Sequence, residues 1–149
     1  MNINIRPAVK NDLPFIMEMV HELALFEKAP DEVINTAAWM ERDGFGENPL
    51  FKAIIAENDK EVLGFALYYY RYSTWKGKCL YLEDFYVKEE FRNFGIGKQL
   101  FETVIKTAKH DNCNRISWQV LEWNEPAIKF YKKFNATYDK EWLNGSIDL

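Results

Sequence analysis

The chain is organised around the stretch Tyr81-Leu-Glu-Asp-Phe-Tyr-Val87, which continues as Lys88-Glu-Glu-Phe-Arg-Asn-Phe-Gly-Ile-Gly-Lys-Gln-Leu-Phe101. Its first part is rich in aromatic and branched residues, which is typical of a largely buried strand. From its end onward, apolar residues recur with a helical period, at Leu100, Phe101, Val104, Ile105 and Ala108. The stretch therefore predicts a strand, a short polar loop and a helix.

Between the strand and the helix lies a glycine-containing turn, Arg92-x-x-Gly95-x-Gly97. Glycines allow a tight turn and let a ligand approach the backbone closely. The first N–H groups of the following helix lack internal partners, and the helix dipole adds partial positive charge, so a phosphate or pyrophosphate would be stabilised there. Arg92 and Lys98 add positive charge on either side of this turn. A tight turn without any ligand is the alternative interpretation.

Two better-known phosphate motifs do not fit this turn. A dinucleotide fingerprint needs a third glycine and a later acidic ligand for the ribose, and neither is found here. The ATP-binding P-loop needs Gly-Lys-Ser/Thr, which is also missing. The sequence thus indicates a pyrophosphate turn of another design.

Length and charge narrow the function classes. With 149 residues, 48% of them apolar, the chain predicts one folded domain over residues 1–149 and argues against disorder. Its net charge of −4 argues against a nucleic-acid partner. Acids dominate residues 21–47 and bases dominate residues 88–109, a division that suits a cationic acceptor and an anionic cofactor. Ordinary solvated helix faces would give the same pattern.

The remaining composition points to a cytoplasmic protein. Cys79 and Cys113 have no metal or redox spacing, and two cysteines suit a reducing compartment. Neither His21 nor His110 belongs to a set of residues with the sequence spacing typical of a metal site, so we expect no bound metal. No leader opens the chain and no apolar run is long enough to cross a bilayer, so we expect no membrane partner.

The pattern of predicted elements indicates an α/β or α+β sheet with helices packed on its faces. We expect the following elements: a strand at 2–6, a helix from Asn11 or Asp12 to before Pro30, a helix capped by Thr36, a hairpin of 51–57 with 61–72, the central strand and helix, a strand at 115–121, a helix capped by Asn124, and strands at 138–143 and near Ile147.

Several motifs together resemble the GNAT superfamily of N-acetyltransferases, and within it the diamine acetyltransferases. They are Glu22-Leu-Ala24, Asp43-Gly-Phe-Gly-Glu-Asn-Pro49, Tyr81-Leu-Glu-Asp-Phe85, Phe94-Gly-Ile-Gly97 and Glu122-Trp-Asn-Glu-Pro126. That family includes spermidine/spermine N1-acetyltransferases and a thialysine N-epsilon branch. The resemblance implies a mixed, largely antiparallel sheet of six to seven strands, splayed between strands 4 and 5, with helices on both faces. It also implies acetyl-CoA as co-substrate, direct attack in a ternary complex, and a homodimer.

The resemblance also implies site residues. Cofactor contacts fall on Phe85, Tyr86, Val87, Arg92, Asn93, Phe94, Gly95, Ile96, Gly97, Lys98, Asn124, Pro126, Ala127 and Tyr131. Acceptor contacts fall on Phe26, Glu27, Glu83 and Asp84. Glu83 takes the role of the catalytic carboxylate, and Tyr131 that of the acid that protonates the thiolate. A strand-end acid and a core tyrosine are the structural alternatives for these two residues.

The chemistry agrees with a carboxylate in this strand. An alkyl ammonium titrates near ~10 and must lose a proton before it can attack a thioester. Glu83 and Asp84 are neighbours, and side chains alternate across a strand, so both can serve one site only if a bulge redirects one of them.

The acceptor stays open at this point. Where polyamine-acetylating relatives have a tyrosine, this chain has Phe26, and the segments 26–28 and 72–77 look more like the thialysine branch. A polyamine or diamine and a lysine-like amino acid are both compatible. A protein or peptide amine acetyltransferase, a non-catalytic acyl-CoA-binding module and, more remotely, a phosphate-binding regulatory domain are the rival classes.

Overall fold

A computed structural model describes residues 1–149, and the chain forms two compact units, Met1–Trp118 and Gln119–Leu149. The first unit contains β1 (Asn4–Pro7), α1 (Leu13–Phe26), α2 (Ala37–Gly44), β2 (Lys52–Glu57), β3 (Val62–Ser73), β4 (Gly77–Val87), α3 (Ile96–His110) and β5 (Arg115–Trp118). Short 3₁₀ turns lie at Lys10–Asp12, Pro30–Glu32 and Glu89–Phe91. The second unit contains one helix, α4 (Glu125–Lys132).

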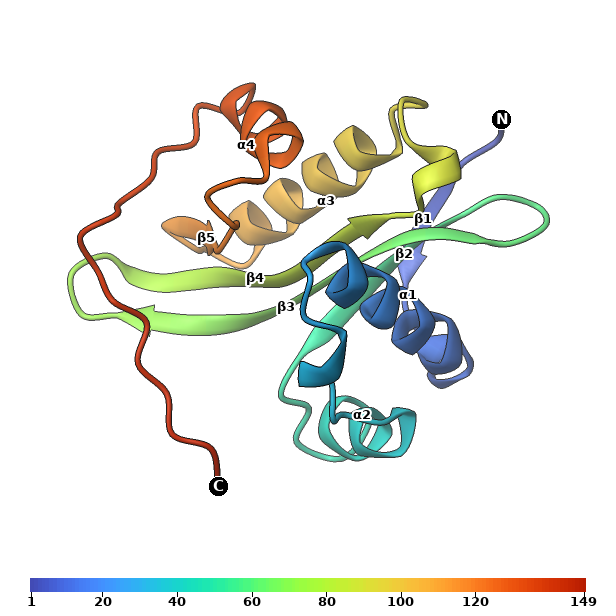
Figure 1. Ribbon diagram of the computed structural model, residues 1–149, viewed down its shortest axis with the longest axis horizontal. Coiled ribbons are helices and arrows are strands. Elements are labelled where there is room, and N and C mark those ends of the chain that lie inside the picture. The colour runs from blue at the N-terminus through green and yellow to red at the C-terminus, as the bar shows by residue number, and fades with distance from the viewer. The chain divides into compact units, whose positions relative to one another are not determined.

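The strands of the first unit form one five-stranded sheet in the order β1-β2-β3-β4-β5 (Figure 1). The first four strands pair antiparallel, and β5 pairs parallel to β4. This parallel pairing is possible because α3 connects the two strands, as a parallel crossover requires. The ladder between β4 and β5 runs from the Cys79–Arg115 pair to the Leu82–Trp118 pair.

Helices pack on both faces of this sheet, as predicted. Alternate residues of the central strands, such as Ile55 and Phe65, form one buried cluster with Leu13 and Ile16 of α1. On the other face, the ring of Phe101 from α3 packs edge-on against the rings of Phe85 and Trp118 in the sheet. The ring centroids are 5.8 and 5.7 Å apart, respectively. The alternation follows from the two-residue period of a strand.

The predicted number of strands is wrong. The sheet has five strands and not six to seven, because the segments 138–143 and near Ile147 adopt no strand conformation. A strand exists only where its backbone finds a hydrogen-bonding partner. In the second unit the polar contacts of this segment are made by side chains instead: the Trp142 indole donates to Asp139 at 2.8 Å, and Lys140 pairs with Glu122 at 2.9 Å.

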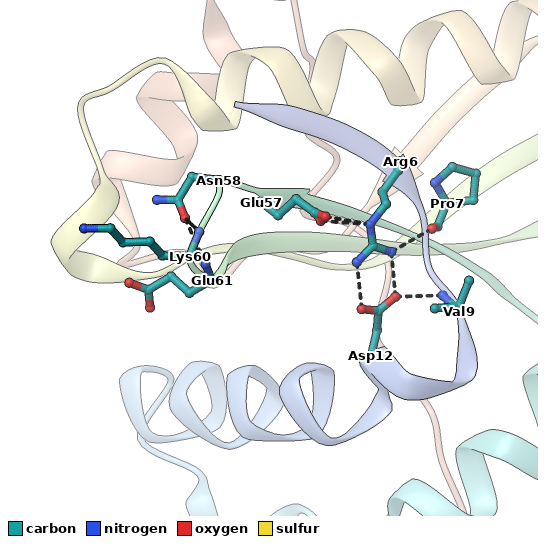
Figure 2. Close-up of polar contacts among 8 residues, drawn as sticks. All are labelled: Arg6, Pro7, Val9, Asp12, Glu57, Asn58, Lys60 and Glu61. Carbon is teal, nitrogen blue, oxygen red and sulfur yellow. Dashed lines mark hydrogen bonds and ion pairs between the residues drawn. The ribbon is translucent and has the colours of Figure 1, made fainter. Parts of the chain in front are cut away.

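Two predicted caps are confirmed, and one is not. The Thr36 hydroxyl accepts a hydrogen bond from the Trp39 N–H at 3.1 Å, and the Asn124 carboxamide accepts one from Ala127 at 3.3 Å. Asp12 precedes α1 but makes no capping bond to it. Its buried carboxylate instead accepts from the Val9 N–H and from two nitrogens of Arg6, which also pairs with Glu57 (Figure 2).

None of the helices is both long and apolar enough to span a membrane.

Candidate active site

A β-bulge brings the two neighbouring acids of β4 to one site. Leu67 of β3 pairs with Asp84, whereas the next residue, Tyr68, pairs with Leu82. Glu83 is therefore the extra residue, opposite no residue of β3, and the alternation of side chains is interrupted there. As a result, Glu83 and Asp84 line the same cleft, although they are adjacent in the strand. This is the condition under which both acids can serve one site.

The cleft has a volume of about 410 Å³ and an apolar wall. Its apolar lining comes from α1, α2, β3 and the segment before β2: Val20, Met40, Leu50, Phe51 and Leu67. Its polar lining consists of Asn35, Asp43, Tyr69, Glu83 and Asp84. A cleft with apolar walls and a few convergent polar groups is the usual form of a small-molecule site.

Glu83 is exposed and is contacted by an aromatic group on β3. The Tyr69 hydroxyl donates a hydrogen bond to its carboxylate at 3.4 Å. The Tyr69 ring packs on Tyr81 with 5.3 Å between centroids, and the Arg71 guanidinium lies 4.9 Å from the centre of the Tyr81 ring. The carboxylate is thus accessible to an acceptor and restrained by a packed tyrosine.

Asp84 lies in a strongly anionic, desolvated setting. Burial, with the charges of Glu83 and Glu27 added to it, raises the pKa of Asp84 to about 6. Burial also raises the pKa of Glu27, which follows the last residue of α1. A bound cation would relieve the repulsion among these three carboxylates and favour their ionised forms. The arrangement therefore suits an ammonium group.

The glycine turn has an unusual backbone and leaves the start of α3 uncapped. Asn93 and Gly95 both have positive φ, 71° and 78°, which is the left-handed region that glycine adopts at low cost. Gly95 takes the capping position of α3, and no side chain bonds to the first turn of this helix. Asn93, Phe94 and Gly95 are exposed. This geometry fits an anion bound by backbone N–H groups.

Arg92 holds the turn to the end of β4 and to α1. Its Nε donates to the Val87 carbonyl at 2.9 Å, and its guanidinium lies 5.4 Å from the ring centre of Tyr86 and 5.7 Å from that of Phe26. Phe26, predicted to contact the acceptor, is therefore placed beside Arg92, and neither Phe26 nor Glu27 lines the cleft.

The second unit contains the remaining predicted residues. Asn124 caps α4, Pro126 lies in its first turn, and Tyr131 is its one buried residue. Burial raises the pKa of the Tyr131 phenol above its ordinary value, with a smaller contribution from Tyr138. Tyr131 therefore keeps its proton at neutral pH.

Sequence reasoning missed most of the cleft lining. Asn35, Asp43 and Tyr69 line it and were not among the predicted acceptor contacts. A signal was present for Asp43, which lies in the acidic segment 21–47 and opens one of the quoted motifs. A signal was also present for Tyr69, which belongs to an aromatic run on the third strand that suits a slot for an aliphatic amine stem. Asn35 has no such signal, because only the folded backbone brings it to β4.

The chain is similar to several known proteins. The model of the acetyltransferase (GNAT) family matches residues 14–136. Pig (Sus scrofa) thialysine N-epsilon-acetyltransferase is 38% identical over 143 residues, which cover 91% of this chain and 84% of the relative. Human spermidine/spermine N(1)-acetyltransferase-like protein 1 is 42% identical over 89% of this chain and 20% of its own length. An integron cassette protein of V. cholerae superposes with a TM-score of 0.78 at 25% identity, covering 99% of this chain and 93% of that protein.

Proposed function

Given that the chain belongs to the acetyltransferase (GNAT) family, as an enzyme that acetylates amines, we propose that it transfers the acetyl group of acetyl-CoA to a primary amine of a small cationic acceptor. The observation that carries the proposal is the bulge in β4, through which Glu83 and Asp84 line one apolar cleft. Two carboxylates in such a setting attract an ammonium group and can accept its proton.

In the proposed reaction, the ammonium first loses a proton to Glu83 or Asp84, directly or through one water molecule. The neutral nitrogen then attacks the acetyl carbonyl carbon and a C–N bond forms. As the C–S bond breaks, the thiolate takes up one proton and the nitrogen, positively charged in the adduct, gives one up, so that an amide and a free thiol result. Asp84 suits the role of base, because a pKa of about 6 lies close to neutral pH. Glu83 suits the role of the exposed carboxylate that meets the acceptor first.

The residues of the glycine turn fit the pyrophosphate of the coenzyme. The backbone N–H groups of Ile96, Gly97 and Lys98 open an uncapped helix, and Lys98 adds a positive charge. When bound, acetyl-CoA supplies the activated thioester. Contacts from Phe85, Tyr86, Val87, Asn93, Phe94, Asn124, Pro126 and Ala127 belong to this proposal.

Tyr131 is the proposed source of the proton that the departing thiolate takes up. Its buried phenol stays protonated until a stronger base forms beside it. Tyr131→Phe removes one hydroxyl and little volume, so we expect turnover to fall roughly 10²–10⁴-fold, the usual range for a lost general acid. Coenzyme affinity, measured by calorimetry, should change far less. Wild-type turnover in this variant would assign Tyr131 to the core alone.

The acceptor is proposed to be a diamine, a polyamine or a lysine-like amino acid such as thialysine, since relatives with those names match most of this chain. A homodimer, which the resemblance implies, is part of the same proposal. Sedimentation of the purified protein tests it, and a monomer at micromolar concentration would contradict it.

The test of the function is release of free coenzyme A thiol from acetyl-CoA with spermidine, putrescine, lysine and thialysine in parallel. We expect turnover with at least one of them. Gly97→Asp should abolish coenzyme A binding in calorimetry, because it places a carboxylate at the helix start. Gly145→Asp is the matched control, since nothing lies within 4 Å of a side chain added at Gly145. Undiminished binding by folded Gly97→Asp would contradict the pyrophosphate assignment.

A further inference from the structure

The cleft receives carboxylates from two separate elements. Glu83 and Asp84 come from β4, and Asp43 comes from the last turn of α2. No lysine, arginine or histidine lines the cleft. A molecule that fills it therefore meets carboxylates from two elements, β4 and α2, and no basic side chain of the lining.

The wall that accompanies these carboxylates is apolar. Val20, Met40, Leu50, Phe51 and Leu67 provide aliphatic and aromatic surface suited to a methylene chain. A chain of this kind with an ammonium group at each end would match both the wall and the charges.

The backbone around Asp43 is held in place by packing. The Leu50 N–H donates to the Asp43 carbonyl at 2.7 Å. The next residue, Gly44, packs so closely that an added Cβ would lie 2.2 Å from the Phe51 ring. Both Leu50 and Phe51 line the cleft as well. The position of Asp43 at the cleft is therefore a rigid part of the fold.

Arg42 pairs with Asp43 from outside the cleft. Its guanidinium donates to both oxygens of the Asp43 carboxylate, at 2.8 and 3.2 Å, but Arg42 is exposed to solvent and is not part of the lining. Because water screens an ion pair at the surface, the attraction between Arg42 and Asp43 is modest, and an acceptor ammonium competes with Arg42 for the carboxylate. The pair also holds the pKa of Asp43 below its usual value, so the carboxylate is ionised at neutral pH.

We propose that Asp43 is a specificity-determining residue that binds the second, non-reacting ammonium group of the acceptor and thereby selects a diamine over a lysine-like amino acid. The inference rests on the proposed function. A lysine-like acceptor carries a carboxylate at its far end, which would lie in the same anionic cleft and be repelled. A diamine of the same length carries no such group.

Three acceptors with the same five-carbon stem separate the effect of the second ammonium group from that of the carboxylate: 1,5-diaminopentane, pentylamine and lysine. Pentylamine lacks the second charge, and lysine is 1,5-diaminopentane with a carboxylate added. We expect wild-type kcat/KM to be highest for the diamine. Asp43→Asn should lower kcat/KM for the diamine roughly 5–10-fold, mainly through KM, and leave pentylamine within about 2-fold. The preference for the diamine over lysine should shrink accordingly.

Glu41→Gln is the matched control, because Glu41 is an exposed acid of the same helix that does not line the cleft. It should leave all three acceptors unchanged. Equal effects of Asp43→Asn on the diamine and pentylamine, or a wild-type preference for lysine, would overturn the proposal. If wild type acetylates none of the three, the proposed function fails for this class. Calorimetric binding of 1,5-diaminopentane then still decides the role of Asp43, since weaker binding by Asp43→Asn supports it and equal binding refutes it.

Discussion

Asp84 is a carboxyl group that the fold keeps away from water beside two other carboxylates. Because its pKa is raised to about 6, the folded state holds its proton more tightly than the unfolded state does. Ionisation therefore lowers stability progressively between about pH 4 and 6, and the full penalty, about 3 kcal/mol from a shift of roughly two units, persists above pH 6.

Asp84→Asn should accordingly stabilise the fold by about 1–3 kcal/mol at pH 8 and by much less at pH 4, where Asp84 of the folded protein is protonated and neutral. The same change should lower kcat/KM for a cationic amine, because one carboxylate of the cleft is lost. Urea unfolding at the two pH values measures the first effect. Glu41→Gln, at an exposed position outside the cleft, is the control and should not stabilise the protein. A loss of stability in Asp84→Asn at pH 8 would contradict the account of this site.

The identity of the two β4 acids could be predicted from the sequence, but their common orientation could not. Alternation along a strand would have placed Glu83 and Asp84 on opposite faces. The bulge depends on the pairing of β4 with Leu67 and Tyr68 of β3, and no local sequence pattern predicts that register. The contact of Phe26 with Arg92 likewise follows from where α1 ends and could not be predicted from the sequence.

At the scale of elements, Gly64 leaves no room for a side chain between β3 and β4. A Cβ added there would lie 2.5 Å from the Tyr86 carbonyl oxygen, a backbone atom that cannot move without shifting β4. Gly64→Ala should therefore destabilise the protein by about 1–3 kcal/mol, as overpacking of a core does. It should also lower coenzyme affinity, because β4 leads directly into the glycine turn.

Gly145→Ala is the matched change for this prediction, since nothing lies within 4 Å of the added carbon. Chemical unfolding of both variants gives the comparison. Equal free energies of unfolding for Gly64→Ala and Gly145→Ala would mean that β3 and β4 move apart at Gly64 at little cost, and would contradict this prediction.

Elements with a local chemical signal were predictable, and those that need a distant partner were not. Thr36 caps α2, and Asn58 accepts the N–H groups of Lys60 and Glu61 in the predicted hairpin turn at 2.8 and 2.9 Å. The segment 138–143 has the composition of a strand but forms none. Composition gives a segment the capacity to pair, whereas pairing requires a neighbour that composition does not reveal.

At the scale of the molecule, Arg6 joins the first strand, the second strand and the start of α1. It bonds to both oxygens of Asp12 at 2.8 and 2.9 Å and to Glu57 at 2.9 Å (Figure 2). Arg6 holds the pKa of Asp12 below its usual value, with the Val9 N–H as a further cause. A lowered pKa means that the network stabilises the fold above about pH 4 and that this contribution is lost as pH falls through the folded-state pKa.

Asp12→Asn should thus destabilise the protein by about 3 kcal/mol at pH 7, since it removes one partner of a largely desolvated ion pair. The wild type should lose stability between pH 4 and 2, and the difference from Asp12→Asn should shrink over that range. Thermal unfolding across these pH values is the measurement. A difference that stays constant with pH would show that Asp12 stabilises through packing and not through its charge.

The overall plan of the first unit could be inferred from the order of strands and helices, because a strand, a crossover helix and a further strand impose a parallel pair. The sequence could not show that β5 ends opposite Leu82, or that α2 contributes Asp43 to the same cleft as β4. Both depend on contacts between residues far apart in the chain.

The central claim is that the carboxylates of the β4 bulge act on the amine and not on the coenzyme. Its most direct test is the full kinetics of Glu83→Gln with a cationic amine from about pH 6 to 10, with coenzyme A affinity measured in parallel. Gln keeps the shape and deletes the charge. We predict that kcat/KM for the amine falls by roughly 10²-fold or more while the coenzyme dissociation constant stays within about 2-fold. Unaltered amine kinetics in a stably folded Glu83→Gln protein would contradict the claim.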